Sequence, residues 1–249
     1  MTLQAVIFDL GDTLWPLQYE TEIWPRVREL MIEEFVALRG EDSAQAGESV
    51  DKLRASLGRI LADTFLGSSY DQLHFQHYVE QALERSGMEG DELAHAVCQS
   101  FYLAEHRHEK VGADRETVDM LAAIRARGLS VGLVSNTFSP GHFHQLALNR
   151  CGAAAHIDVP VYSGDMGFRK PDPRIYRHCL DLLGVPADAT LFVGDRLRED
   201  VVGPQAQGMR ACQYRRYRQE EPRDGIEPDF VADSPAEVLQ IVEQLSGSS

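Results

Sequence analysis

Short apolar segments recur at three places along the chain. They are Leu3–Phe8 (LQAVIF), Val131–Ser135 (VGLVS) and Thr190–Val193 (TLFV). Runs of this length and composition are typical of strands that are buried on both faces of a parallel sheet. The pattern therefore predicts strands at residues 3–8, 131–135 and 190–193.

Segments with helix start and stop signals lie between and after these strands. They begin after Asp114, Ser139-Pro140 and Asp172-Pro173, and they end at Gly128, near Gly152 and at Gly184. Residues 234–237 (SPAE) have the pattern of a capping box and predict a last helix. Strands that alternate with helices indicate βαβ units, so we expect an α/β fold with a Rossmann-like parallel sheet.

The strand pattern is missing between about residues 17 and 110. Apolar residues recur there at helical spacing, as Ile23, Val27, Leu30, Met31 and Phe35, and again as Leu53, Leu57, Ile60 and Leu61. We expect residues 17–110 to form an inserted all-α cap over the carboxyl ends of the strands, where α/β proteins bind ligands. Residues 1–16 and 111–249 would then form the core. Within the cap, the polar stretch 39–51 (RGEDSAQAGESVD) predicts a mobile loop between helices.

Composition narrows the class of protein. The 249 residues carry a formal charge of −15, which argues against a nucleic-acid-binding surface. The cysteines form no C-x-x-C pair, and we expect them to be reduced: Cys98, Cys151, Cys179 and Cys212. No basic leader and no apolar run of membrane-spanning length is visible, so we expect a cytoplasmic protein without a membrane partner. The sequence does not indicate an oligomeric state.

Carboxylates follow two of the predicted strands. Asp9 comes directly after the first strand, and Asp195 and Asp200 lie on the segment after the strand at 190–193. Carboxylate oxygens suit magnesium, and a carboxylate at a strand end can also attack an electrophile. Each acid alone is also compatible with an ordinary turn.

Phosphate-binding side chains are indicated at two further places. Ser135-Asn136 ends the second strand with hydroxyl and amide donors, and Lys170 lies just before the helix start at Asp172-Pro173. A lysine there could neutralise a phosphoryl group as a point charge. Alternatively, Ser-Asn forms a turn and the lysine is solvated.

Taken together, four motifs resemble the haloacid dehalogenase-like superfamily. FDLGDTL resembles its first motif, VSNT the second, RKPDP the third and VGDRLRED the fourth. The resemblance covers roughly residues 3–15 and 111–245, in the expected order. It points to the subgroup with a helical cap of the C1 type, inserted after the first motif.

The resemblance implies a phosphatase that acts on a small phosphorylated metabolite. Asp9 would attack phosphorus and form an aspartyl-phosphate. Mg²⁺ would be held by Asp9, the Gly11 carbonyl and Asp195, with Asp200 assisting through the water shell. This agrees with the physical requirement that a cation must stand between a carboxylate nucleophile and a phosphate dianion.

Within the same resemblance, Ser135 and Lys170 would bind the transferring phosphoryl group, and Asn136 adds an amide donor beside them. Lys170 would also orient the Asp9 carboxylate. Positioning and charge neutralisation of this kind account for most of the catalysis of phosphoryl transfer.

One position departs from the family pattern. Phosphatases of this superfamily usually have an aspartate two residues after the nucleophile, which acts as general acid and base, and here that position is Gly11. Asp12 could substitute for it, although we favour a structural turn role. The alternative function is therefore a catalytically weak or inactive binder of a phosphate ligand.

Two other reactions of the superfamily also lack that aspartate. Haloacid dehalogenation runs without a metal, whereas Asp195 and Asp200 match the metal-using pattern. Phosphonate hydrolysis uses a cap lysine, but the surroundings of Lys52 (VDKLRAS) lack the associated motif, so we interpret Lys52 as a surface charge.

Remaining candidates have ordinary interpretations. The histidine pairs His74/His77 and His106/His108 lack a further ligand pattern. Arg26, Arg28, Trp15 and Trp24 could line a substrate pocket but are interpreted as surface or packing residues. The basic run Arg215, Arg216 and Arg218 is interpreted as part of a surface loop.

Overall fold

The structure is a computed structural model that describes residues 2–17, 20–67, 69–108, 111–221 and 223–247. The chain forms two compact units. Met1–Leu17 together with Lys110–Ser249 make an α/β unit, and Gln18–Glu109 make a helical unit.

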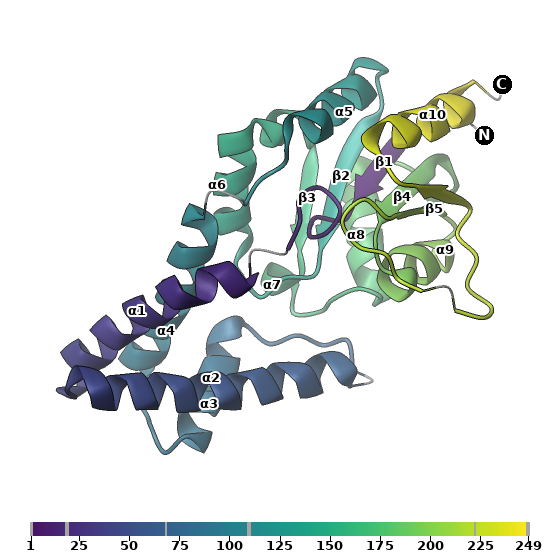
Figure 1. The fold of residues 1–249 in the computed structure, drawn as a ribbon. Coiled ribbons are helices and arrows are strands. Elements are labelled where there is room, and N and C mark those ends of the chain that lie inside the picture. The colour runs from purple at the N-terminus through teal and green to yellow at the C-terminus, as the bar shows by residue number, and fades with distance from the viewer. Residues whose placement is uncertain (1, 18–19, 68, 109–110, 222, 248–249) are drawn as a thin grey trace. The chain divides into compact units, whose positions relative to one another are not determined.

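A six-stranded parallel sheet is the centre of the α/β unit (Figure 1). Its strands are β1 (Ala5–Phe8), β2 (Ser130–Ser135), β3 (Val159–Tyr162), β4 (Thr190–Gly194), β5 (Arg210–Tyr214) and β6 (Phe230–Ala232). Their spatial order is β3-β2-β1-β4-β5-β6, and every neighbouring pair is parallel. The predicted α/β parallel sheet is confirmed, and β3, β5 and β6 are strands that the apolar pattern missed.

Helices connect the strands, as the punctuation of the sequence predicts. They are α5 (Arg115–Ala126), α6 (Gly141–Cys151), α7 (Ser163–Met166), α8 (Pro173–Leu183), α9 (Gly203–Gln205) and α10 (Pro235–Ser246). Short turns of 3₁₀ helix, η1 (Ala153–His156) and η2 (Ala187–Ala189), and a π-helical turn, η3 (Leu197–Val202), complete the unit.

The expected capping residues begin three of these helices. Asp114 accepts a hydrogen bond from the Thr117 amide, Asp172 from the Arg174 amide, and Ser234 from the Glu237 amide. The capping box at 234–237 is only half present, because the Glu237 carboxylate accepts from the amide of Asp233. It therefore stabilises the residue before the cap instead of the cap itself.

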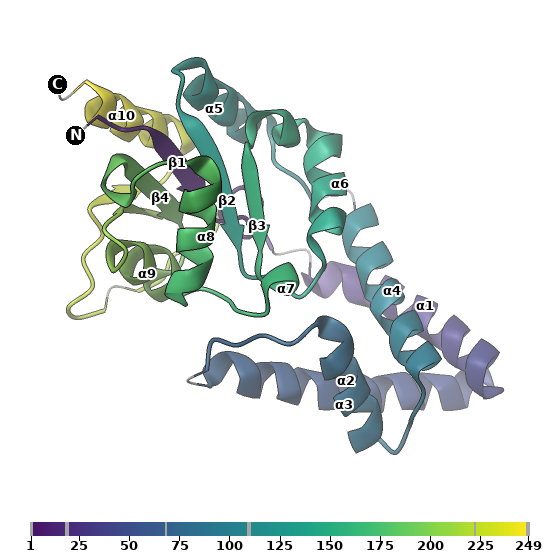
Figure 2. The same cartoon turned by 180° about the vertical axis from the view of Figure 1, so that it is seen from behind.

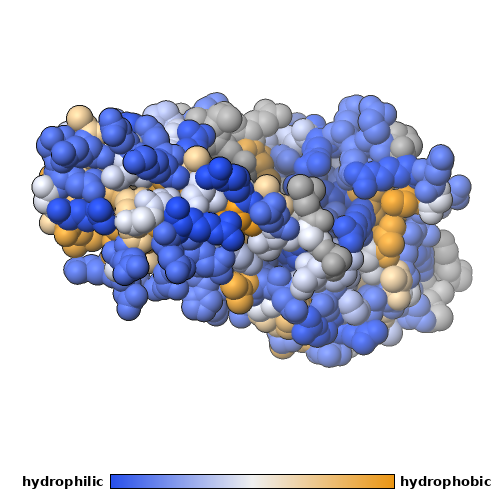
Figure 3. All heavy atoms as spheres, turned by 90° about the horizontal axis from the view of Figure 1, so that it is seen from below, coloured by the Kyte–Doolittle hydropathy of each residue, from blue (hydrophilic) through white to orange (hydrophobic). Residues whose placement is uncertain are grey.

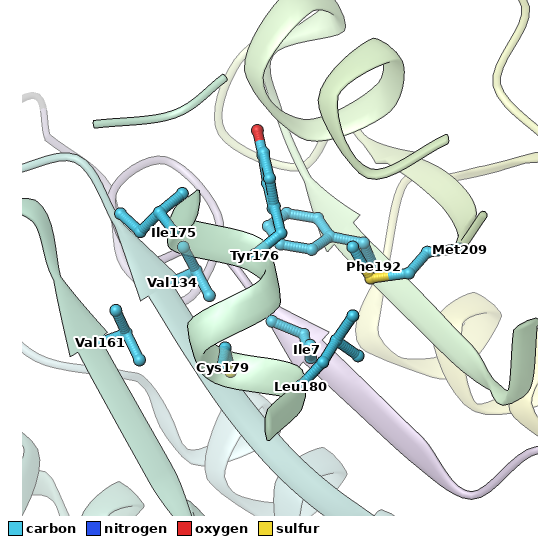
Figure 4. Close-up of a cluster of buried hydrophobic side chains, with 9 residues drawn as sticks. All are labelled: Ile7, Val134, Val161, Ile175, Tyr176, Cys179, Leu180, Phe192 and Met209. Carbon is cyan, nitrogen blue, oxygen red and sulfur yellow. The ribbon is translucent and has the colours of Figure 1, made fainter. Parts of the chain in front are cut away.

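Helix α8 packs against one face of the sheet (Figures 2 and 4). Its buried side chains Ile175, Tyr176, Cys179 and Leu180 lie against Ile7, Val134, Val161, Phe192 and Met209. This cluster joins four neighbouring strands to α8. This packing fixes α8, and Lys170 lies on the segment just before the first residue of this helix, Pro173.

The helical unit contains α1 (Glu20–Arg39), α2 (Ser43–Leu66), α3 (Phe75–Arg85) and α4 (Asp91–Arg107). The predicted loop at 39–51 is wrong over most of its length, because α2 begins at Ser43. A capping box between Asp42 and Gln45 starts this helix, and Ala46 and Val50 are buried. The polar residues of this stretch are thus the solvent side of an amphipathic helix.

Hydrophilic residues cover most of the face shown in Figure 3, and the hydrophobic residues on it form small separate patches. This distribution agrees with the acidic composition. Within the part of the chain that the structure describes, no helix is long and apolar enough to cross a membrane.

Candidate active site

The candidate site lies where three neighbouring strands end. β1 pairs with β2 on one side and with β4 on the other. Asp9 follows β1, the buried Ser135 is the last residue of β2, and Asp195 follows β4. The strand order reverses between β1 and β4, and α/β sheets bind ligands outside the carboxyl ends of strands at such a reversal. Parallel pairing thus brings together segments that are far apart in the sequence.

Three buried carboxylates form a cluster at this edge. One ligand oxygen each from Asp9, Asp195 and Asp200 lies within 4.8 Å of the other two. Asp200 is on the π-helical turn η3, and its Oδ2 accepts a hydrogen bond from the Arg196 amide at 2.9 Å. A Cβ at Gly194 would lie 2.5 Å from Cγ of Asp200, so the glycine makes room for this carboxylate.

Lys170 connects two of the three acids. Its Nζ donates to Asp9 Oδ1 at 2.5 Å and to Asp200 Oδ1 at 2.7 Å, and its side chain is 2% exposed. The Asn136 side chain holds the Lys170 backbone, accepting from its amide at 2.7 Å and donating to its carbonyl at 3.0 Å. Asn136 therefore positions Lys170. The Asn136 amide nitrogen carries a second hydrogen, which could be donated to a phosphate oxygen. That contact stays a prediction.

Burial dominates the electrostatics of the cluster. It raises the pKa of Asp9 to about 6, although the positive charge of Lys170 acts in the opposite direction. Burial, followed by the negative charges of Asp200 and Asp9, raises the pKa of Asp195 to about 8. Burial thus makes the ionised forms of Asp9 and Asp195 less favourable than they are in water. A bound cation would restore the ionised forms.

The residues present fit a divalent metal ion. Three ionised carboxylates against the single buried ammonium group of Lys170 leave two negative charges without a buried cation, although the part-exposed Arg218 lies 3.6 Å from Asp195. Asp195 Oδ2 is buried and accepts no hydrogen bond from the described residues. Oxygen donors of this kind suit a hard cation such as Mg²⁺. Within the described chain, this is the one group of three acidic, histidine or cysteine side chains with such spacing.

The loop after β1 shows why Asp12 and Gly11 differ from the family pattern. Asp12 has a positive φ of 56°, and its Oδ1 accepts a hydrogen bond from the Leu17 amide at 2.8 Å. The side chain thus closes the turn, which is the structural role that we favoured. A Cβ at Gly11 would lie 2.7 Å from Cδ1 of Leu17. The space next to Gly11 is therefore filled by an apolar side chain.

Two residues near Asp195 were missed as site residues in the sequence. The Thr13 hydroxyl donates to Asp195 Oδ1 at 3.4 Å, and Arg218 Nε lies 3.6 Å from Asp195 Oδ2. Thr13 is part of the first motif, which was the available signal. Arg218 belongs to the basic run that we interpreted as a surface loop, and nothing in its local sequence indicated the site.

Most of the other candidates lie in the helical unit and have partners there. Arg28 forms a two-pronged pair with Asp51, Arg26 pairs with Glu29, and Trp24 lies under the Arg54 guanidinium. His77 lies 3.2 Å from Glu80, and His108 lies 3.8 Å from Glu22. Trp15 is buried in the α/β unit, and the side chain of His106 lies outside the described part.

A parallel α/β sheet with buried carboxylates and a lysine at its carboxyl edge is typical of a class of enzymes whose side-chain carboxylates take part in the reaction. The family model of haloacid dehalogenase-like hydrolases matches residues 3–208. The chain belongs to this family and is a hydrolase, so the family resemblance of the four motifs is confirmed.

Some relatives and solved structures of this family align with almost the whole chain, and others with about half of it. The glyceraldehyde 3-phosphate phosphatase of Methanopyrus kandleri is 28% identical over 248 residues, covering 98% of this chain and 99% of its own. The phosphoserine phosphatase of Thermus thermophilus is 32% identical over 131 residues, which is 53% of this chain and 50% of the relative. A 2-haloacid dehalogenase from Pseudomonas syringae has a similar fold, with a TM-score of 0.69, 24% identity and coverage of 98% and 99%.

Proposed function

We propose that the protein is a magnesium-dependent phosphatase that hydrolyses small phosphorylated metabolites through an aspartyl-phosphate on Asp9. The observation that carries this proposal is the bond between buried Lys170 and buried Asp9 inside a cluster of three carboxylates that holds only this one buried cation. Such a cluster needs a further cation, and metal-bound carboxylates are typical of phosphoryl transfer. Archaeal relatives named glyceraldehyde 3-phosphate phosphatase, which align over most of the chain, support the same activity.

The metal would be held by carboxylate oxygens of Asp9 and Asp195 and by the backbone carbonyl of Gly11. Asp200 would contribute through the metal's water shell. When bound, Mg²⁺ supplies neutralising charge to the phosphoryl oxygens and so lowers the repulsion that Asp9 meets. A backbone carbonyl serves equally well from glycine, so Gly11 is compatible with this ligand set.

The side chains of the site divide the chemistry between them. Lys170 fixes the Asp9 carboxylate through Oδ1 and presents a positive charge to the phosphoryl group. A carboxylate oxygen of Asp9 forms the new bond to phosphorus, and the bond from phosphorus to the ester oxygen breaks. Ser135 and Asn136, at the end of β2, would donate hydrogen bonds to the phosphoryl oxygens. Water then hydrolyses the acyl phosphate, which releases inorganic phosphate and restores Asp9.

Gly11 supplies no proton to the departing oxygen. A nitrophenolate or a carboxylate leaves without protonation, whereas an alkoxide needs a proton. We therefore expect aryl and acyl phosphates to be turned over faster than alkyl phosphates. Hydrolysis of the acyl phosphate on Asp9 should then limit turnover and give a burst of leaving group.

The test is hydrolysis of an aryl phosphate with Mg²⁺, with a chelator, and by two matched variants. We expect turnover that needs Mg²⁺ and disappears in Asp9→Asn. Asp12→Asn is the control, because asparagine tolerates the positive φ and its side-chain oxygen can still accept from the Leu17 amide. Turnover that survives in Asp9→Asn would contradict the nucleophile. Turnover lost in a folded Asp12→Asn would show that Asp12 takes part in the reaction and would contradict its purely structural role.

Two alternatives give different results in the same assays. A non-catalytic phosphate binder, suggested by Gly11, would form a beryllofluoride adduct on Asp9 but release no phosphate from a broad panel. A dehalogenase would release chloride from 2-chloropropionate without metal. The three carboxylates of the cluster, which share one buried cation, favour the metal-dependent phosphatase. Glyceraldehyde 3-phosphate is the first metabolite to test.

A further inference from the structure

The loop between β5 and β6 brings an arginine to the acidic cluster. This loop follows Tyr214, the last residue of β5, so it leaves the sheet at the edge where Asp195 lies (Figure 1). Arg218 on this loop places Nε 3.6 Å from Asp195 Oδ2. The carboxylate is buried, whereas the arginine side chain is 37% exposed. The guanidinium thus extends from the metal-binding edge toward solvent.

The loop is anchored near this position by Glu220. The Glu220 carboxylate accepts from the Leu197 amide at 2.9 Å and pairs with Arg223 at 2.7 Å. The Glu220 carbonyl also accepts from the Gln213 side chain at 3.5 Å. These contacts tie the loop to β5 and to the turn η3. Arg218, two residues before Glu220, is therefore held beside Asp195 by contacts that do not use its own side chain.

The guanidinium of Arg218 donates no hydrogen bond to the residues that the structure describes. A separation of 3.6 Å is an electrostatic contact and too long for a hydrogen bond. Among the described residues, Arg218 has no hydrogen-bond partner, whereas its neighbours Arg215 and Arg216 pair with Asp233 and Asp114. A guanidinium presents five donors in a planar fork that matches a carboxylate or a phosphate.

A second exposed arginine lies beside the same edge. Arg196 follows Asp195 directly, and its guanidinium is within electrostatic range of Asp195, Glu199 and Asp9. With Mg²⁺ bound, the metal and Lys170 together balance the three carboxylates of the cluster. The arginines then add positive charge at the solvent side of the site. Lys170 already contacts the nucleophile, so Arg218 is available for a different part of the substrate.

We propose that Arg218 is a specificity residue that pairs with a second anionic group of the substrate, a carboxylate or a second phosphate, apart from the transferring phosphoryl group. The inference rests on the proposed function and adds a substrate class to it. In the structure, Arg218 approaches Asp195 without a hydrogen bond to it. A metal ion held by that carboxylate would leave the guanidinium available to the substrate.

The test compares two phosphate monoesters that differ at one end, 2-phosphoglycolate and 2-hydroxyethyl phosphate. Their binding to Asp9→Asn protein with Mg²⁺ is measured by calorimetry, so the result does not depend on turnover. We expect the carboxylate-bearing ligand to bind at least about 10-fold more tightly, since a charge-assisted pair is being formed. Arg218→Gln should remove this preference, and Arg218→Lys should keep part of it.

Arg215→Gln is the matched control. Arg215 lies at the start of the same loop and is 39% exposed, but its guanidinium pairs with Asp233. This variant should keep the preference. Equal binding of both ligands by the parent, or an equal loss for both in Arg218→Gln, would overturn the proposal. So would an effect of Arg218→Gln on Mg²⁺ affinity alone, or failure of both ligands to bind. Turnover of an aryl phosphate by the unmodified protein separately decides the proposed function.

Discussion

Removal of the Lys170 charge tests whether the buried ion pairs organise the site. Lys170→Met keeps an unbranched side chain of similar length but leaves Asp9 and Asp200 without their cation. Breaking a buried pair from one side costs about 3–5 kcal/mol. The pKa of Asp9, about 6 beside Lys170, rises when that positive charge is removed, so the group takes up a proton near neutral pH and limits the cost. At pH 7 we therefore expect a loss of about 3 kcal/mol in the free energy of unfolding.

Denaturant unfolding of four proteins provides the assay: the parent, Lys170→Met, Asp200→Asn and the double variant. Asp200→Asn in the Lys170→Met background removes one of the unpaired charges. The double variant should then be more stable than the sum of the single effects predicts, by about 1 kcal/mol or more. Mg²⁺ should restore part of the stability of Lys170→Met without restoring turnover.

Two results would refute this reasoning. The first is a Lys170→Met variant with a free energy of unfolding within about 1 kcal/mol of the parent, which is the usual value of a surface pair. The second is strict additivity in the double variant. Either would mean that the Lys170 ammonium group does not compensate Asp9 and Asp200 in solution.

Two further predictions concern the α/β unit. Gly11→Asp alone should lower the melting temperature and give at most a small gain in turnover, because the Leu17 side chain must move away from the new Cβ, which would lie 2.7 Å from Leu17 Cδ1. Combined with Leu17→Ala, it should recover stability and raise turnover of an alkyl phosphate at least about 10-fold, whereas no gain in a stable double variant would contradict a missing general acid. Asp114→Asn keeps the helix cap but loses the pair with Arg216; although burial acts to raise it, hydrogen bonds from Thr117 and the Arg216 charge leave the Asp114 pKa below its usual value. An acid whose pKa is lowered in the folded state stabilises the fold above its unfolded pKa near 4, and this stabilisation is lost as the pH falls. The stability difference between parent and variant in urea titrations should therefore shrink below about pH 4. A difference independent of pH would refute this prediction.

The sequence predicted the parts of the fold that have strong local signals. β1, β2 and β4 are central strands whose side chains are buried on both faces, which produces continuous apolar runs. β3 and β6 are the edge strands, and β5, although buried, carries Arg210 and Gln213, which interrupt an apolar run as Pro160 does in β3. Their pairing depends on neighbours that are distant in the sequence, so no local pattern identified them.

The site shows the same division. Asp9 and Asp195 directly follow strong strands, so parallel pairing alone predicts that they lie together. The bonds from Asn136 to the Lys170 backbone join residues 34 positions apart. The approach of Arg218 to Asp195 depends on a loop whose course is fixed by Glu220. Long-range contacts of this kind have no signature in the residues themselves.

The turn after Asp9 explains why we do not expect Asp12 to take over the acid-base role that is missing at Gly11. Asp12 has a left-handed backbone conformation, and its carboxylate is bonded to the Leu17 amide. To act as a proton donor it would have to leave that bond, which holds the turn closed. Leu17 in turn occupies the space beside Gly11. The loop therefore places the apolar Leu17 where a polar side chain would be needed, and the Asp12 carboxylate holds Leu17 in that place through its amide. Such a loop permits turnover of substrates whose leaving group needs no proton.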